Sequence, residues 1–158
     1  MKKMGFLFIA FSFSFLISCS NEDAASKTDL AKVFADSSKY TTAQWLDSIQ
    51  DFGTVMMGEK VKITFRCKNT GKKLLYISDV RPGCGCTVAD YTKEPISPGK
   101  QGNVVAEFDS KKSHPGKVRK TIFVHTNTKN ITPHYLIFAG EIQAVDSTHT
   151  ASKKINNK

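Results

Sequence analysis

Alternation of apolar and polar side chains with a period of two is the sequence feature that most constrains the fold of this chain. It is clearest over residues 61–68, where Val61, Ile63, Phe65 and Cys67 alternate with charged residues and a threonine. A period of two places successive side chains on opposite faces of a β-strand, so this segment is expected to have one buried and one solvated face. Similar stretches fall at 45–49, 52–55, 74–80, 104–108, 118–126 and 131–142.

Turn-forming residues separate these stretches at short intervals. Glycine, proline and asparagine gather at 58–59, 69–72, 81–86, 95–102, 109–116 and 127–130. Neighbouring parallel strands would need crossover connections, which are usually helices. No segment between the stretches has the 3.6-residue period of such a helix. The sequence therefore predicts an all-β fold, an immunoglobulin-like antiparallel β-sandwich of about seven strands.

The N-terminal residues have the features of an export signal rather than of a folded domain. Lys2 and Lys3 form a positive head, and residues 6–17 are almost wholly apolar. This apolar run is shorter than the ~20 residues that span a bilayer, as in a secretory signal peptide. The closing Leu16-Ile17-Ser18-Cys19 resembles the lipobox of bacterial lipoproteins, which implies cleavage before Cys19 and lipidation of that cysteine. The alternative is an ordinary signal peptide that ends near a cysteine by chance.

These features divide the 158-residue chain into four segments. They are a lipoprotein signal peptide (1–18), a lipidated tether (19–40), the sandwich domain (41–142) and a polar tail (143–158). Within the tether, residues 30–34 either form one helical turn or continue the irregular chain. Acyl chains on Cys19 give firm anchoring, so we expect a protein of the cell envelope. We place it at the outer membrane, with its domain in the periplasm or at the cell surface.

Charge narrows the set of partners. The chain has 23 Lys and Arg against 14 Asp and Glu, and removal of Lys2 and Lys3 with the signal leaves 21 against 14, a formal charge of +7. The lysines fall in predicted turns and in the tail, which indicates a solvated surface; the alternative is attraction to acidic polymers or anionic headgroups. We do not expect nucleic acid as a partner, because an exported protein does not meet it. The expected partners are the membrane, through the lipid anchor, and an envelope protein.

Five short motifs follow one another along the predicted domain. They are Asp51-Phe52-Gly53-Thr54-Val55, Lys68-Asn69-Thr70-Gly71, the run from Ile77 to Val88 that contains Pro82-Gly83-Cys84-Gly85-Cys86, Pro98-Gly99, and Phe108-Asp109-Ser110. In this order they resemble the bacterial "domain of unknown function 1573" family. That family is common in Bacteroidetes lipoproteins and is related in fold to the immunoglobulin-like domains of abnormal-spindle and hydin type. The resemblance covers roughly residues 41–142 and implies shape and location, not an activity.

Two positions depart from the pattern of that family. Gly83 stands where a small hydroxyl residue is frequent, and Cys67 stands where an aromatic or aliphatic residue is usual. Neither departure changes the expected fold.

The pair Cys84 and Cys86 is the feature with the most chemistry, and three interpretations of it are open. In an oxidising compartment the thiols can form a disulfide. Two extended residues separate Cα atoms by about 6.6 Å, near the upper limit for a disulfide, and Gly85 permits the bend that shortens this distance. Such a small ring would be strained and easily reduced.

The other two interpretations are a metal site and a structural role. Two thiolates on one loop suit copper(I), whereas zinc would normally need four ligands. In the structural interpretation the thiols of Cys84 and Cys86 pack beneath the loop, or one of them bonds to Cys67. The inward position of Cys67 otherwise indicates a buried, inert thiol.

Other chemistry has little support in the sequence. His114, His125, His134 and His149 are each isolated, so we expect surface or core residues rather than ligands. No nucleophile elbow, phosphate loop or zinc-binding helix motif appears. We therefore expect a lipid-anchored binding or scaffold module that is not an enzyme and has no cofactor. The alternative is a copper(I)-binding or thiol-redox envelope protein that uses the Cys84-Gly85-Cys86 pair.

Overall fold

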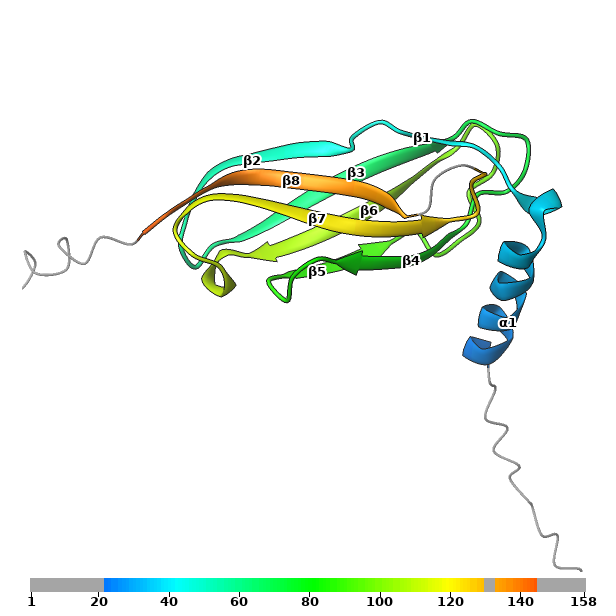
Figure 1. Ribbon diagram of the computed structural model, residues 1–158, viewed down its shortest axis with the longest axis horizontal. Coiled ribbons are helices and arrows are strands. Elements are labelled where there is room, and N and C mark those ends of the chain that lie inside the picture. Colours follow the sequence, from blue (N-terminus) through cyan, green and yellow to red (C-terminus); the bar gives the residue numbers. More distant parts are fainter. Residues whose placement is uncertain (1–21, 130–132, 145–158) are drawn as a thin grey trace, which may run out of the picture.

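Two stacked β-sheets form the body of the protein, and one helix extends from one end (Figure 1). The computed structural model describes residues 22–129 and 133–144, with side chains from Asp29 onward. The helix α1 spans Glu22–Ala35, and the 3-10 turns η1 and η2 span Ser37–Lys39 and Ser110–Lys112. The strands are β1 (Ala43–Trp45), β2 (Ile49–Met56), β3 (Lys60–Asn69), β4 (Ile77–Pro82), β5 (Thr87–Tyr91), β6 (Gln101–Asp109), β7 (Gly116–Thr126) and β8 (His134–Gln143).

The strand order is β1-β3-β6-β5 in one sheet and β2-β8-β7-β4 in the other. Their facing sides bury a core that includes Phe65, Phe108 and Phe138, none of which is exposed to solvent. The ring centroids of Phe108 and Phe138 lie 5.5 Å apart in a tilted contact, the geometry that aromatic pairs prefer. The predicted immunoglobulin-like β-sandwich is therefore confirmed.

β3 has the burial pattern that its sequence predicts. Every second residue from Ile63 to Cys67 is buried, and the residues between them are exposed. Its pairing with β6 runs without interruption from Lys60, opposite Asp109, to Lys68, opposite Gln101. Burying one large apolar side chain stabilises the fold by roughly 1.5–3 kcal/mol, so the inward face of this strand is a major part of the core.

The predicted strand over residues 45–49 is wrong, because the chain changes sheets there. β1 ends at Trp45 in one sheet and β2 begins at Ile49 in the other. Asp47 lies in the connection and holds it to β3: its carboxylate accepts hydrogen bonds from the Arg66 side chain, with Nη2 at 3.1 Å. These hydrogen bonds lower the pKa of Asp47. Alternation continues through the connection, but it carries no information about which sheet each residue joins.

The expectation of purely antiparallel pairing is wrong for one strand pair. β2 runs parallel to β8, from Ile49 opposite Ile137 to Met56 opposite Gln143, with a shift in register between Asp51 and Thr54. Gly53, in that shift, has a φ of 73°, a conformation open to glycine. No crossover helix is needed, because the chain between these two strands passes through both sheets.

Three further elements differ from the prediction. β5 is not among the predicted strands, and it raises the number of strands in the described part of the chain to eight. The fourth strand starts at Ile77, later than expected; Leu75 instead forms an isolated bridge to Ile96. Most of the expected tether is helical, since α1 is 14 residues long rather than one turn. β8 ends at Gln143, where the polar tail was expected to begin, and residues 130–132 and 145–158 lie outside the described residues.

Two asparagines in predicted turns are fully buried. Asn127 donates from Nδ2 to the carbonyl oxygens of Lys39 and Leu74, both at 2.9 Å, and its Oδ1 accepts from the backbone N–H of Tyr76 at 2.8 Å. Asn69 similarly donates to Ile96 at 2.8 Å. Each side chain satisfies backbone groups of segments far apart in sequence, as buried polar groups require. These hydrogen bonds fasten the loops at the end of the sandwich from which α1 extends.

No helix of the described residues combines the length and apolar character that crossing a membrane requires.

Candidate functional site

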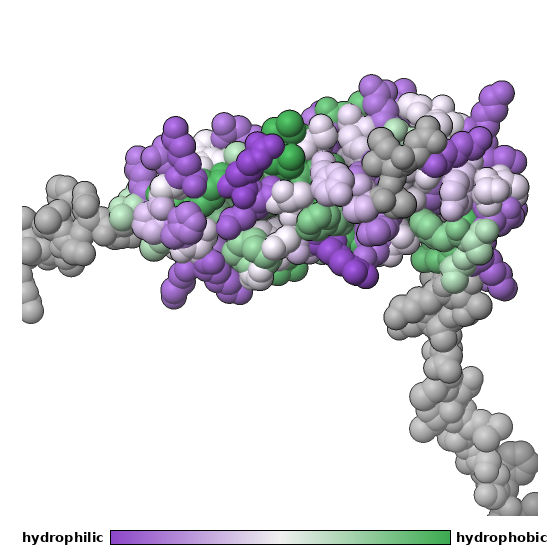
Figure 2. Space-filling model, viewed as in Figure 1, coloured by the Kyte–Doolittle hydropathy of each residue, from purple (hydrophilic) through white to green (hydrophobic). Residues whose placement is uncertain are grey.

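The outer face of the β2-β8-β7-β4 sheet carries an apolar patch at positions where alternation predicts solvated residues. Ile49 on β2 lies opposite Ile137 on β8, and Phe123 on β7 lies opposite Tyr135 on β8. The rings of Phe123 and Tyr135 meet edge-on with centroids 5.6 Å apart. Ile49 and Tyr135 are 64% and 57% exposed. We call these four residues the outer patch; Figure 2 shows hydrophobic surface among charged residues on one face of the molecule.

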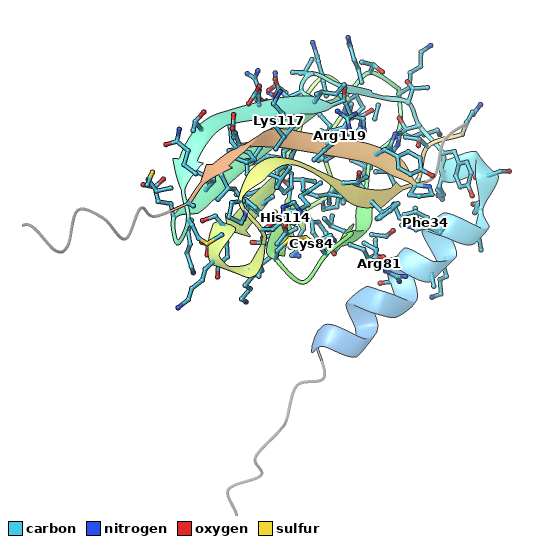
Figure 3. The ribbon with its side chains drawn as sticks, turned by 60° about the vertical axis from the view of Figure 1, so that its left-hand side comes forward. Phe34, Arg81, Cys84, His114, Lys117 and Arg119 are labelled. Carbon is cyan, nitrogen blue, oxygen red and sulfur yellow. A yellow bond between two sulfur atoms is a disulfide. The ribbon has the colours of Figure 1, made fainter. Side chains whose placement is uncertain are left out.

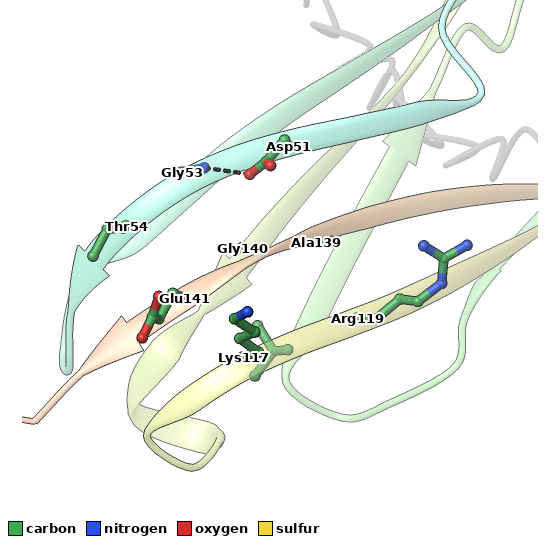
Figure 4. A pocket seen from close by; sticks show the side chains of 9 residues that line it. Asp51, Gly53, Thr54, Lys117, Arg119, Ala139, Gly140 and Glu141 are labelled. Carbon is green, nitrogen blue, oxygen red and sulfur yellow. Dashed lines mark hydrogen bonds between the residues drawn. The ribbon is translucent and has the colours of Figure 1, made fainter.

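A shallow open groove of about 500 Å³ lies on the same sheet, two residues further along the strands than the outer patch. Ala139 on β8 forms part of its floor, with Asp51 on β2 and Arg119 on β7 as its register partners on either side (Figure 4). Lys117 lies opposite Glu141 in the next row. The remaining lining residues are Gly53, Thr54, Val118 and Gly140.

The charges of this groove are only partly neutralised. The Asp51 carboxylate accepts a hydrogen bond of 2.7 Å from the backbone N–H of Gly53. Lys117 and Arg119 are exposed, and neither forms an ion pair with any residue in the described part of the chain. The groove therefore offers two cationic side chains to a ligand or partner, beside an apolar surface.

Cys84 and Cys86 lie at the corner that connects β4 to β5, away from Lys117 and Arg119 (Figure 3). Their sulfurs form a disulfide, and the Cα atoms are 5.3 Å apart, a shorter distance than that between the same atoms in a fully extended chain. Cys84 is half-buried, Gly85 is exposed, and Cys86 is only 5% exposed. The Thr87 hydroxyl oxygen lies 3.5 Å from the Cys84 sulfur and 3.8 Å from the Cys86 sulfur.

Backbone hydrogen bonds hold this corner on both sides. The Gly83 N–H donates to the Thr121 carbonyl on β7 at 2.8 Å, and the Asp109 N–H donates to the Cys86 carbonyl at 2.9 Å. Because β7 and β6 belong to different sheets, the corner bridges the two layers of the sandwich. Copper(I) would need both cysteines as thiolates, whereas the disulfide occupies both sulfurs.

Cys67 does not join that pair. It is a free thiol without solvent exposure on β3, and burial raises its pKa above the usual value for a thiol. A protonated, inaccessible thiol is a poor nucleophile and a poor metal ligand. The structure thus leaves Cys67 as a packing residue.

The histidines are spread over the molecule. The ring of His134 is buried, and its Nε2 lies 3.0 Å and 3.1 Å from the hydroxyl oxygens of Thr126 and Thr128. His114 is near the Pro115 carbonyl on the surface, and His125 is half-buried on β7. His149 and the predicted lipidation residue Cys19 lie outside the described residues. Over residues 29–129 and 133–144, no group of three or more His, Cys, Asp or Glu side chains is placed to hold a metal ion.

Sequence reasoning did not find the outer patch. Phe123 and Tyr135 lie at positions of their strands that face solvent, and their sequence neighbours Ile122 and Leu136 are buried. A large apolar residue on the solvent-facing side of an alternating strand can indicate a binding surface. Only the pairing of the strands shows that two such residues lie next to each other.

The alternating strands, two-sheet packing and buried aromatic core define an immunoglobulin-like β-sandwich. The family model described as "Protein of unknown function (DUF1573)" matches residues 43–142, so the chain belongs to that family. This confirms the resemblance found in the sequence. No curated protein sequence matches the chain.

Solved structures share this fold at low sequence identity. A protein of unknown function from Porphyromonas gingivalis is 16% identical with a TM-score of 0.59; the match covers 67% of this chain and 49% of that one. This chain thus spans about half the length of that protein. The ASH/PapD-like domain 7 of human CEP192 is 11% identical with a TM-score of 0.53, over 68% of this chain and 89% of that one. The VesB protease of Vibrio cholerae is 12% identical with a TM-score of 0.52, over 72% and 34%.

Proposed function

We propose that this protein is a lipid-anchored, non-catalytic binding module of the cell envelope. In this proposal the β2-β8-β7-β4 sheet binds another envelope protein through its outer face. The observation that carries the proposal is the outer patch, in which two exposed side chains, Ile49 and Tyr135, and two partly buried ones lie in register on neighbouring strands.

The composition of the outer face suits protein recognition. Single exposed apolar residues are ordinary, but contiguous ones mark interaction surfaces. Aromatic and aliphatic side chains form the desolvated centres of protein interfaces, and charged residues form the rims. Here Ile49 and Tyr135 would be central, and Arg119 and Lys117 would lie at the rim. Because these two cations have no ion-pair partner in the described residues, we expect the partner to present acidic side chains beside an apolar one.

The anchor and the binding face are compatible in space. Cys19 precedes α1 by three residues in sequence, and a helix of 14 residues is about 21 Å long. α1 extends from one end of the sandwich, whereas the outer face lies along its side (Figure 1). A lipid at Cys19 would therefore leave the outer patch accessible to another protein of the same membrane.

A catalytic role has no arrangement of side chains to support it in the described residues. Acidic side chains with close basic partners form ion pairs at the surface, such as Lys60 with Glu107 at 2.8 Å and Arg81 with Asp79 at 2.6 Å. Such pairs are typical of a solvated surface and differ from a general acid or base held in a pocket.

The test is capture of the partner from detergent-solubilised envelope with the tagged full-length protein. Wild-type protein is compared with Ile49→Ser/Tyr135→Ser and with the control Leu74→Ser/Val88→Ser, which changes exposed apolar residues elsewhere. We expect one protein to be recovered with the wild type and the control, and at least about tenfold less of it with the patch variant, as loss of interface anchors implies. Melting curves should show that both variants fold. Equal recovery with both variants would show that the outer patch is not the binding face.

A further inference from the structure

We propose that the Cys84–Cys86 disulfide is a thiol–disulfide exchange site, which accepts electrons from a cysteine pair of another exported protein through attack at Cys84. This inference does not depend on the binding role of the outer patch, because it needs only the two cysteines and access to Cys84. The two features are neighbours, since a Cβ atom added at Gly83 would lie 3.5 Å from the Phe123 ring.

The disulfide is poorly placed to stabilise the fold. The entropy that a cross-link removes from the unfolded chain grows with the logarithm of the loop it closes. Here the cysteines are separated by a single residue, so the closed loop is almost the shortest one available. A structural role alone therefore accounts badly for two cysteines at this position.

The corner does not need the disulfide in order to keep its shape. The Gly83–Thr121 and Cys86–Asp109 backbone hydrogen bonds hold it to β7 and β6, independently of the sulfurs. β4 and β5, on either side, are each paired with a neighbouring strand. Breaking the sulfur–sulfur bond thus leaves every one of these backbone contacts available, and the domain can remain folded in the reduced state.

The two sulfurs differ in their surroundings, which gives the exchange a direction. Cys84 is half-buried and next to the exposed Gly85, where an added Cβ atom would meet no heavy atom within 4 Å apart from those of its chain neighbours. Cys86 is almost fully buried. An incoming thiolate therefore reaches Cys84 first. The Thr87 hydroxyl lies 3.8 Å from the Cys86 sulfur and 3.5 Å from the Cys84 sulfur, so it can donate a hydrogen bond to a thiolate at either position, and the difference in access alone sets the direction.

The exchange balances without any further reagent. A thiolate of the partner attacks the Cys84 sulfur, the Cys84–Cys86 bond breaks, and its electron pair stays on the Cys86 sulfur as a thiolate. The product is a mixed disulfide between the partner and Cys84. The second thiolate of the partner then attacks the partner's own sulfur in that bond and expels the Cys84 thiolate. The partner has lost two electrons and its two thiol protons to form a disulfide, and Cys84 and Cys86 have gained two electrons and bind two protons to become a dithiol.

The first test uses reduced dithiothreitol, a small dithiol, on the full-length protein. Alkylation followed by peptide mass spectrometry measures the reduction of Cys84 and Cys86, and circular dichroism measures folding in the same samples. We expect the pair to be reduced while the strand signal and the melting curve remain those of a folded sandwich, with Cys67 unmodified. Reduction that occurs only together with unfolding would overturn the proposal and leave the disulfide as a structural bond.

The second test measures direction with single-cysteine variants. Cys86→Ser leaves Cys84 as the thiol at the corner, and Cys84→Ser leaves Cys86. With glutathione disulfide as the probe, we expect Cys86→Ser to form the mixed disulfide at least about tenfold faster, because access controls the rate of exchange. Equal rates, or a faster reaction of Cys84→Ser, would contradict attack at Cys84.

Discussion

Buried polar side chains decide how the loops of this protein are arranged. Asn69, Asn127 and His134 all lie inside the end of the sandwich next to η1, and each bonds to backbone or hydroxyl groups of other segments. A buried polar group without its partner costs about 1–3 kcal/mol, so each of these residues is tied to the set of loops around it. For His134, the same burial also makes stability depend on pH.

Substitution of His134 should reduce the loss of stability at mildly acidic pH. Burial lowers the pKa of His134, and the nearby His125 lowers it further. The unfolded chain, with a histidine pKa near 6.5, therefore binds the proton more readily than the folded protein. The contribution of His134 to stability is fully present above about pH 6.5 and is lost as the pH falls from there towards the folded pKa.

The measurement is the free energy of unfolding in urea at neutral and at mildly acidic pH. We expect wild-type protein to lose stability between them, and His134→Gln to lose clearly less. His114→Gln, which changes an exposed histidine, should retain the wild-type dependence. Identical pH dependence in wild type and His134→Gln would show that protonation of His134 does not oppose folding.

At the level of elements, the junction of β2 and β8 is a close contact that leaves little room for a side chain. Gly140 on β8 packs beneath the Phe52 ring, and an added Cβ would lie 2.6 Å from the Gly53 carbonyl oxygen. The glycine allows the bulged part of β2 to approach β8 closely enough for parallel pairing. Asp51 and Thr54, on either side of the bulge, both line the groove, so this junction also shapes the candidate binding face.

Gly140→Ala should destabilise the protein by about 1–3 kcal/mol, because the new methyl group would overlap backbone and ring atoms that cannot move freely. Gly85→Ala is the matched control: its Cβ would meet no heavy atom within 4 Å apart from those of its chain neighbours, so the change should be less than about 1 kcal/mol. Urea unfolding of both variants provides the comparison. If Gly140→Ala were as stable as Gly85→Ala, close approach of β2 to β8 would not be the reason for the glycine.

At the scale of the whole molecule, the candidate sites are arranged around a rigid body. α1 lies at one end of the sandwich and the end of β8 lies at the other (Figure 1). The outer patch is on the face of one sheet, and the disulfide corner connects β4 and β5, the edge strands on one side. Anchoring would thus use one end of the molecule, whereas recognition and exchange would use adjoining surfaces, because Phe123 of the outer patch lies beside Gly83 at the disulfide corner.

The anchor can be tested by replacing Cys19. In cells supplied with radioactive palmitate, we expect wild-type protein to carry the label and to sediment with membranes. Cys19→Ala should lose the label and leave the membrane fraction, because acyl chains supply the membrane affinity. Cys86→Ser, another cysteine variant, should keep both properties. Wild-type protein without label would remove the lipid anchor from the proposed function, while the tests of the outer patch and of the disulfide would still stand.

The sequence by itself was sufficient to predict the fold class. Alternation identified β3, β6, β7 and most of β8, because the side-chain period of a strand is a local property. The ordered motifs around Cys84 and Cys86 identified the family, and the family match confirms this. Because Cys84 and Cys86 are separated by one residue in the sequence, a disulfide between them was also one of the open alternatives.

Only the tertiary structure decided how these elements meet. The change of sheet around Asp47, the parallel pairing of β2 with β8 and the meeting of Phe123 with Tyr135 all join segments far apart in sequence. Pairing depends on packing and hydrogen bonding between distant residues, whereas a periodic pattern reports only the faces of one segment. For that reason the sequence predicted a sandwich, and the assembled sheets revealed the surface on which it is proposed to act.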